Sequence, residues 1–152
     1  MGVGEICSRE VVCINRIECV AKAAQLMRKH HVGSVVVVEE KAGGHTPIGM
    51  LTDRDIVVAV VAVGLNPEAV TAGDIMSSEL LSVNEDAGIA ETTELMRVRG
   101  VRRIPVTSSR GSLIGILAAD DVQSLLAEEM SALASISERA QRRESGTRKS
   151  AP

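Results

Sequence analysis

The residues best suited to bind a ligand stand where an apolar run gives way to Thr52-Asp53-Arg54-Asp55. A strand that ends at Thr52 and leads at once into a helix presents a hydroxyl and unpaired backbone N–H groups, which suit a phosphate. The carboxylate of Asp55 can accept both hydroxyl hydrogens of a ribose. We include Arg54, between them, among the predicted ligand residues. The alternative interpretation is structural: Thr52 caps the helix and Asp55 favours its N-terminal dipole.

Other chemistries find little support in the residue types. The chain has no Phe, Tyr or Trp, so a bound ring must lie between aliphatic side chains rather than on an aromatic platform. No Gly-x-Ser-x-Gly elbow or other nucleophile pattern is present. His30, His31 and His45 lack Cys or carboxylate neighbours at ligand spacing. We therefore predict no catalytic residues, no metal site and no required cofactor.

The composition describes a globular chain of 152 residues and 16.0 kDa, 45% hydrophobic and 24% charged, with a net charge of −3. The acidic balance argues against broad binding to nucleic acid or anionic membranes. The longest apolar run, residues 56–65, is too short to span a bilayer, and the first residues do not resemble a secretion signal. We expect a cytoplasmic location. Cys7, Cys13 and Cys19 fit neither a disulfide framework nor a zinc site and are expected to be reduced.

The chain repeats itself. Leu26-Met27-Arg28 recurs as Leu95-Met96-Arg97, an offset of 69 residues that also aligns Ser8 with Ser77 and Val37 with Val106. Further on, residues 48–51 match 114–117 at an offset of 66, so the second copy lacks three residues in a loop. We expect a first motif over residues 1–70, a second over 71–137, and a fraying helix with a disordered tail over 138–152.

Each copy shows the order β-α-β-β-α. Apolar runs predict strands and 3.6-residue periodicity predicts helices, at residues 11–14, 18–30, 35–38 and 48–51 in the first copy and 80–83, 85–99, 104–106 and 113–117 in the second. Residues 56–63 are rich in valine, but their repeat partner after Asp121 is an amphipathic helix, so we expect a helix there too. A helix apolar on nearly every face must be buried, and the smallest available partner is a second copy of the chain. We therefore expect a homodimer that pairs through residues 56–63 and an apolar face at Leu125, Leu126 and Leu133, and we place Val60 in its interface.

These motifs resemble the tandem cystathionine-β-synthase (CBS) domain pair, also called a Bateman module. The resemblance rests on residues 47–56 (PIGMLTDRDI), 103–106 (RIPV) and 114–122 (IGILAADDV), and covers about residues 6–133. It implies an α/β fold of the mixed α+β type, in which two β-α-β-β-α motifs pack through their sheets about a pseudo-twofold axis. It also implies two clefts that bind AMP, ADP, ATP or other adenosine compounds, with Thr52 on phosphate and Asp55 on ribose.

The family pattern also implies that each cleft is completed by the opposite motif. The Asp55 cleft should receive Ser82, Val83, Arg102 and Arg103, whose guanidinium groups can grip a phosphate. The Asp121 cleft should receive Ile14, Gly33 and Ser34, with no cation, and Ala118 stands there in place of Thr52. We therefore expect one strong nucleotide site and one weak or vacant one.

The resemblance implies a regulatory module that senses an adenosine nucleotide and passes its occupancy to an unidentified partner protein. The alternative is a structural dimerisation protein whose ligand sites have decayed, which Ala118 favours. The sequence does not select among the adenosine ligands.

Overall fold

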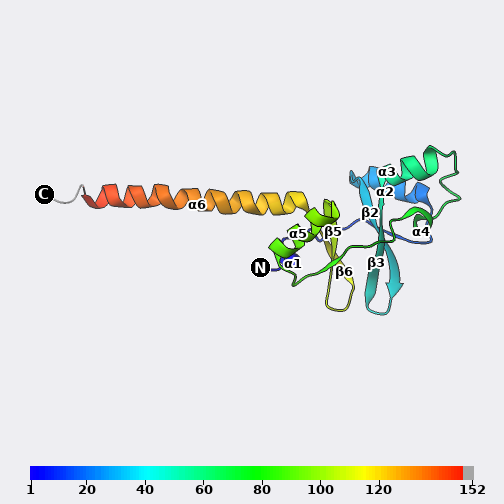
Figure 1. Cartoon of the computed structure of the whole chain (residues 1–152), viewed down its shortest axis with the longest axis horizontal. Helices are drawn as coiled ribbons and strands as arrows, with labels where there is room; N and C mark the ends of the chain where they lie inside the picture. Colours follow the sequence, from blue (N-terminus) through cyan, green and yellow to red (C-terminus); the bar gives the residue numbers. More distant parts are fainter. Residues whose placement is uncertain (149–152) are drawn as a thin grey trace.

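A computed structural model describes residues 1–148, which form two three-stranded sheets with helices beside each (Figure 1). The first sheet comprises β1 (Cys13–Asn15), β2 (Ser34–Lys41) and β3 (Gly44–Thr52), with helices α2 (Val20–His30) and α3 (Asp53–Ile56). The second comprises β4 (Val83–Asn84), β5 (Arg103–Thr107) and β6 (Leu113–Ala118), with α5 (Ile89–Arg99) and α6 (Ala119–Arg148). Two short helices, α1 (Val3–Ile6) and α4 (Ala72–Ile75), precede the two sheets.

The two sheets have the same topology, as the repeat predicts. In each, the first strand pairs parallel with the second and the second pairs antiparallel with the third. Val35, Val36, Val37 and Val38 of β2 are all buried, at 3% exposure or less. A wholly apolar strand of this kind requires cover on both faces. The mixed α+β fold built from two equivalent motifs is confirmed.

The opening segment of each motif packs in the core of the other motif. Val3 and Cys7 are buried among residues of the second sheet, whereas Ala72 is buried with the first. The exchange is symmetric: Ser8 N–H donates to the Ile116 carbonyl, and Ser77 N–H donates to the carbonyl of Met50, each at 2.9 Å. The boundary expected at 70/71 divides the repeat in the sequence. The two cores do not follow it, because each includes the opening segment of the other motif.

Two equivalent glycines permit this exchange. A Cβ at Gly49 would lie 2.6 Å from the Met76 sulfur and 2.7 Å from the Ser77 carbonyl oxygen. A Cβ at Gly115 would lie 2.5 Å from the Cys7 sulfur and 2.8 Å from the carbonyl oxygen of Ser8. Any side chain at either position would push the crossing segment away from the sheet.

The valine-rich segment after α3 is helical, as predicted, but it is a π-helix, η1 (Val57–Val61), with Ala62 N–H donating to Val57 and Leu65 N–H to Val60. Val60 is fully buried in the core of the first motif. It therefore does not lie at a surface, and its expected place in a dimer interface is wrong. Within η1 the exposed valines are Val57, Val58 and Val61, at 55%, 53% and 65% exposure.

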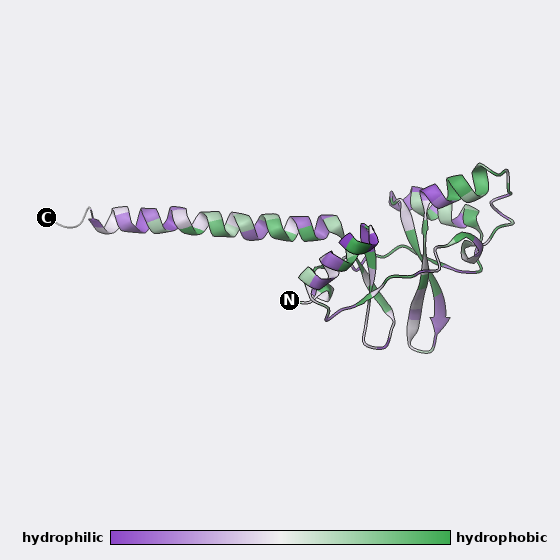
Figure 2. Ribbon diagram, in the orientation of Figure 1, coloured by the Kyte–Doolittle hydropathy of each residue, from purple (hydrophilic) through white to green (hydrophobic). Residues whose placement is uncertain are grey.

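The last helix is longer than expected. The tail predicted to fray and become disordered from residue 138 is instead continuous α6 helix to Arg148, while residues 149–152 lie outside the described part of the chain. Most of α6 projects from the body as a single arm (Figure 1) on which polar and apolar residues alternate (Figure 2). No helix within residues 1–148 is both long enough and apolar enough to cross a membrane.

Candidate functional site

A cavity of about 600 Å³ opens between the two motifs. Its size falls within the range typical of small-molecule sites, roughly 300–1,000 Å³. The first motif lines it with residues at the start of β2, the end of β3 and the first turn of α3, namely Gly33, Ser34, Met50, Thr52, Asp53 and Asp55. The second motif contributes the segment before β4 and the start of β5, namely Ser77, Glu79, Leu81, Val101, Arg102, Arg103 and Pro105.

Thr52 and Asp55 hold each other in place by a reciprocal capping box. Asp55 N–H donates to Thr52 Oγ1 at 3.1 Å, and Thr52 N–H donates to Asp55 Oδ2 at 2.9 Å. The structural interpretation of this motif is therefore correct. Both side chains can still bind a ligand. Thr52 Oγ1 only accepts in the capping box, so its hydroxyl hydrogen can be donated, and Asp55 Oδ1 has no hydrogen-bond partner among residues 1–148. Both side chains are half-buried at the cavity wall.

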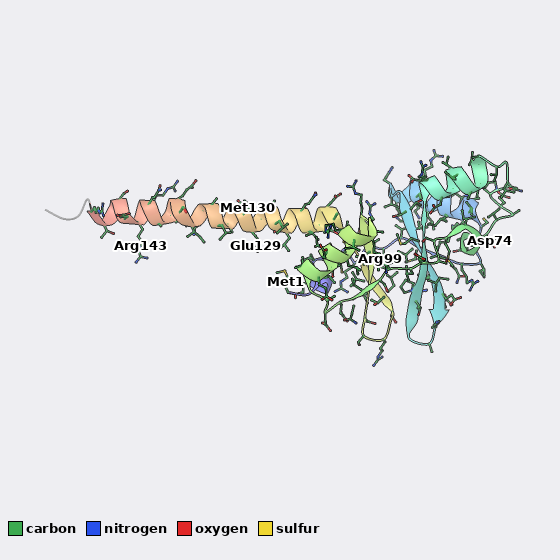
Figure 3. The ribbon with its side chains drawn as sticks, viewed as in Figure 1. Met1, Asp74, Arg99, Glu129, Met130 and Arg143 are labelled. Atoms are coloured by element: carbon green, nitrogen blue, oxygen red, sulfur yellow. The ribbon has the colours of Figure 1, made fainter. Side chains whose placement is uncertain are left out.

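A second Thr-x-x-Asp segment shows what the capping box does by itself. Thr71 and Asp74 form the same reciprocal pair at the start of α4, at 2.9 and 3.3 Å. These hydrogen bonds lower the pKa of the Asp74 carboxyl below its ordinary value. Asp74 is exposed at the end of the molecule opposite the α6 arm (Figure 3) and does not line the cavity. The spacing alone thus indicates a helix start, and the surroundings distinguish Asp55.

The equivalent position in the second motif keeps half of this arrangement. Ala118 N–H donates to Asp121 Oδ2 at 2.7 Å, but Ala118 has no hydroxyl to return the bond. Neither residue lines the cavity. The two Asp positions therefore differ in their capping partners, and only Asp55 lines this cavity.

Two arginines face the cavity from the start of β5. Arg102 makes a weak ion pair with Asp120, with 3.4 Å between Nη2 and Oδ1, and its side chain is 81% exposed. Its carbonyl accepts from Ala119 N–H at 2.9 Å, so it is tied to the first turn of α6. Arg103 pairs with Ala118 in the sheet, but its side chain makes no hydrogen bond or ion pair within residues 1–148 and can meet an anion.

Several predicted ligand residues lie elsewhere. Gly33 and Ser34, which the sequence assigns to the Asp121 cleft, line the cavity of Asp55 and Arg102. The side chains of Ile14 and Val83, at 1% and 9% exposure, belong to the two cores and offer no surface to a ligand. Arg54 and Ser82 are exposed but do not line the cavity.

Sequence reasoning missed the segment that closes the cavity from the second motif. Ser77, Glu79 and Leu81 lie there because α4 packs on the first motif and carries the following residues across the first sheet. The match of Ser77 to Ser8 and Glu79 to Glu10 at offset 69 was the available signal. It marked an ordered segment without showing which sheet it crosses.

The apolar part of the cavity wall consists of aliphatic side chains, those of Met50, Leu81, Val101 and Pro105. The charges of the wall are mixed, since Asp53 and Glu79 stand with the two arginines.

Within residues 1–148 no three His, Cys, Asp or Glu side chains gather as a potential metal site. The three cysteines are free, and burial raises the pKa of the Cys7 and Cys13 thiols above its ordinary value. A raised pKa keeps a thiol protonated and unreactive.

Comparison with protein families gives the same two units. The CBS domain model matches residues 3–62 and again residues 72–128. The chain belongs to the CBS domain family. An uncharacterized protein of Methanopyrus kandleri is 42% identical over 122 residues, which cover 80% of this chain and 61% of that protein. The chain therefore spans less than two thirds of that relative. Hypoxic response protein 1 of Mycobacterium tuberculosis is 36% identical over 124 residues, covering 82% of this chain and 84% of the relative.

Solved CBS structures have the same fold. The crystal structure of Hypoxic Response Protein I with two coordinated zinc ions aligns with a TM-score of 0.73 and 34% identity, over 82% of this chain and 98% of that one. Two more distant structures carry adenosine compounds. The cytosolic domain of the Mg²⁺ channel MgtE in complex with ATP aligns at 24% identity and a TM-score of 0.70, covering 82% of this chain and 48% of that one. The CBS domain pair of MJ0100 with 5′-methylthioadenosine and S-adenosyl-L-methionine aligns at 22% and 0.69, covering 85% and 98%. At these identities the likeness establishes the fold alone.

Proposed function

We propose that this CBS pair is a regulatory module that binds one adenosine nucleotide per chain in the cavity between its motifs. The observation that carries the proposal is the meeting of Thr52 and Asp55 from one motif with Arg102 and Arg103 from the other around a single cavity. Cap, carboxylate and cations come from distant parts of the chain, and no one of them alone would indicate a ligand.

Asp55 holds the ribose. Its Oδ2 is committed to the Thr52 backbone, which fixes the orientation of the carboxylate and leaves Oδ1 to accept from sugar hydroxyls. A hydrogen bond to a charged acceptor contributes about 1.5–3 kcal/mol. The capping box therefore positions the binding group before the ligand arrives, which reduces the entropy lost on binding.

The phosphate lies between Thr52 and the two arginines. The Thr52 hydroxyl hydrogen is available as a donor, since Oγ1 accepts in the capping box. Arg103 has no competing partner in the described chain, and Arg102 has only the long contact to Asp120. Two guanidinium groups also offset the negative charge that Asp53 and Glu79 bring to the same cavity.

The adenine ring lies against aliphatic side chains. With no aromatic residue in the chain, Met50, Leu81, Val101 and Pro105 supply the apolar surface. Such walls provide dispersion contacts and exclude water without the directional preference of ring stacking. The named ATP and S-adenosyl-L-methionine complexes of fold relatives support an adenosine ligand of this kind.

Arg102 supplies a route by which occupancy changes the protein. It pairs with Asp120 in the first turn of α6, and a phosphate in the cavity competes with Asp120 for the same guanidinium. Ligand binding thus alters the contacts at the base of the α6 arm. A ligand can shift a conformational equilibrium only through such unequal contacts in the two states.

The proposal is tested by calorimetric titration of AMP, ADP, ATP and S-adenosyl-L-methionine into the wild type, Asp55→Ala and Asp74→Ala. Both aspartates occupy Thr-x-x-Asp capping boxes, so the two variants lose the same local helix cap. Only Asp55→Ala should lose binding, by about tenfold or more for a charge-assisted bond. Asp74→Ala should bind as the wild type does.

Absence of binding by every adenosine compound in the wild type would contradict the proposal and favour the structural dimerisation protein. Equal losses in the two variants would show that the cap, rather than the ligand contact, carries the effect. A thermal melt of each variant, followed by circular dichroism, reports the loss of the cap separately from the loss of binding.

A further inference from the structure

The α6 arm carries an apolar stripe that nothing in residues 1–148 covers. Val122 is buried against the body, but Leu126, Met130, Leu133 and Ile136 are 58%, 70%, 64% and 61% exposed. These residues and Ala140 recur at spacings of three and four, which places them on one face of an α-helix. Met130 lies well out along the arm (Figure 3), and most of the stripe lies beyond residue 128, where the second CBS match ends.

An arm of this composition requires a partner to remain helical. In proteins most of the stability of a helix comes from packing of its amphipathic face rather than from helix propensity. Ser135, Ser145 and Thr147 direct their hydroxyls to backbone carbonyls three or four residues earlier, and Gly146 adds further conformational freedom. The residues from 126 onward therefore depend on burial of the stripe against another surface.

The charge pattern of the arm identifies that surface. Residues 119–138 hold five carboxylates, Asp120, Asp121, Glu128, Glu129 and Glu138, and no Lys or Arg. Residues 139–148 hold four arginines, Arg139, Arg142, Arg143 and Arg148, against Glu144. The helix dipole favours such a gradient only within the first and last turns. Glu128, Glu129 and Glu138 lie beyond the first turn, so the dipole does not account for them.

We propose that the arm pairs with the α6 arm of a second copy in antiparallel orientation. Antiparallel pairing sets the basic end of each arm beside the acidic part of the other, whereas parallel pairing opposes like charges along the whole length. The exposed stripe over residues 126–140 is centred on Leu133. Superimposing the basic segment 139–148 on the acidic segment 120–129 of the other arm places the centre of the pair near Ala134. The apolar and electrostatic patterns thus specify nearly the same alignment.

The surface is tested by sedimentation equilibrium of the full chain from 1 to 100 µM, with Leu133→Glu as the disrupting variant. Ser131→Glu is the matched control, since Ser131 faces the opposite side of the helix. We expect a dimer for the wild type and the control, and at least a tenfold weaker association for Leu133→Glu, with loss of helical signal at 222 nm. A monomeric wild type, or a Leu133→Glu chain as dimeric as its control, overturns the proposal. So does a dimer that Val61→Glu alone dissociates, because the interface would then be the η1 face.

The orientation is tested by charge reversal. The triple variant R139E/R142E/R143E should weaken association at least tenfold, and adding E128R/E129R to it should restore association, because the reversed gradient is again complementary when antiparallel. In a parallel pair, like charges would lie opposite each other in the wild type and in both variants. Neither charge reversal would then change the association, and this result would contradict the antiparallel orientation.

Nitroxide labels give the orientation directly. They are attached at Ala134→Cys or Gln141→Cys in a chain whose native cysteines are replaced by alanine and whose melt matches the wild type. Antiparallel arms hold the labels at 134 within the spacing of two packed helices, about 8–10 Å plus the label length, and separate those at 141 by a further axial offset of about 20 Å. Equal separations at the two positions would show parallel arms and overturn the assignment. These measurements do not involve nucleotide, so their outcome is independent of the proposed ligand site.

Discussion

The two motifs share a topology but differ at the positions that face a ligand. Both use an aspartate carboxylate to cap the helix after the third strand, at Asp55 and Asp121. Only the first returns the bond through a threonine, and only its cavity meets two arginines. At the repeat-equivalent positions the second strands begin with Gly33-Ser34 in one motif and Arg102-Arg103 in the other. The aspartate is thus retained where the fold needs it, and the additional groups appear only where a phosphate would lie.

The largest effect should come from the arginines. Arg103→Ala should weaken AMP binding about tenfold or more, because a charge-assisted contact to phosphate is worth about 1.5–3 kcal/mol. Binding of adenosine, which has no phosphate, should hardly change. Calorimetric titration of both ligands gives the difference. Equal losses for AMP and adenosine would place Arg103 on the nucleoside or in the fold rather than on phosphate.

The glycines at the crossing segments should show where the motifs remain equivalent. Gly49→Ala and Gly115→Ala each force a Cβ against a sulfur and a backbone carbonyl, so each should cost about 1–3 kcal/mol of unfolding free energy. At roughly 2–4 °C per kcal/mol, the melting temperature should fall by several degrees in both. Gly88→Ala, which meets no atom within 4 Å and changes only the N-cap of α5, is the control for the steric effect. A large effect at only one of the two glycines would break the packing equivalence.

Restoring the missing hydroxyl should raise stability by a smaller amount. In Ala118→Thr the new Oγ1 can accept from Asp121 N–H and complete the capping box, which contributes about 0.5–2 kcal/mol. The melting temperature measured by circular dichroism should therefore rise by a few degrees. Thr52→Ala should lower it by a similar amount. A drop in stability for Ala118→Thr would show that the second motif has no room for the hydroxyl.

The smallest effect concerns pH and the exposed capping box at Thr71. The pKa of Asp74 in the folded chain is lowered from its ordinary value of 3.8, mainly by its hydrogen bonds with Thr71. A carboxyl with a depressed folded pKa adds stability above the unfolded value and loses it as the pH falls through the folded value. The stability difference between the wild type and Asp74→Ala should therefore be constant from pH 5 to 7 and shrink below about 3.8. A difference that does not change down to pH 2.5 would contradict this.

The repeat made much of the fold predictable from sequence. The repeat offsets of 69 and 66 residues align residues 56–63 with the amphipathic helix after Asp121. They therefore predict a helix where valine propensity alone favours a strand. The structure confirms a helical segment there. Local periodicity could not show that Val60 faces its own core, because a helix apolar on most faces gives no direction for burial.

The cavity was only half predictable for a related reason. Thr52, Asp55, Arg102 and Arg103 came from motif positions and do line it. Gly33 and Ser34 were assigned to the other cleft, since the repeat defines equivalent residues but not which of them meet across the junction. That meeting depends on α1 and α4 crossing to the opposite cores, a long-range contact without a local signal. The extension of α6 to Arg148 was missed because its serines and Gly146 resemble a loop composition.

In the proposed function, one cavity per chain, built around Asp55, binds nucleotide. To measure this, AMP is titrated calorimetrically into the wild type, Asp55→Ala and Asp121→Ala, each checked for an intact melt. We expect about one strong site per chain, loss of that site in Asp55→Ala, and a dissociation constant within about threefold of the wild type in Asp121→Ala, a difference below 1 kcal/mol. Two equal sites per chain, or a loss in Asp121→Ala as large as that in Asp55→Ala, would contradict the account.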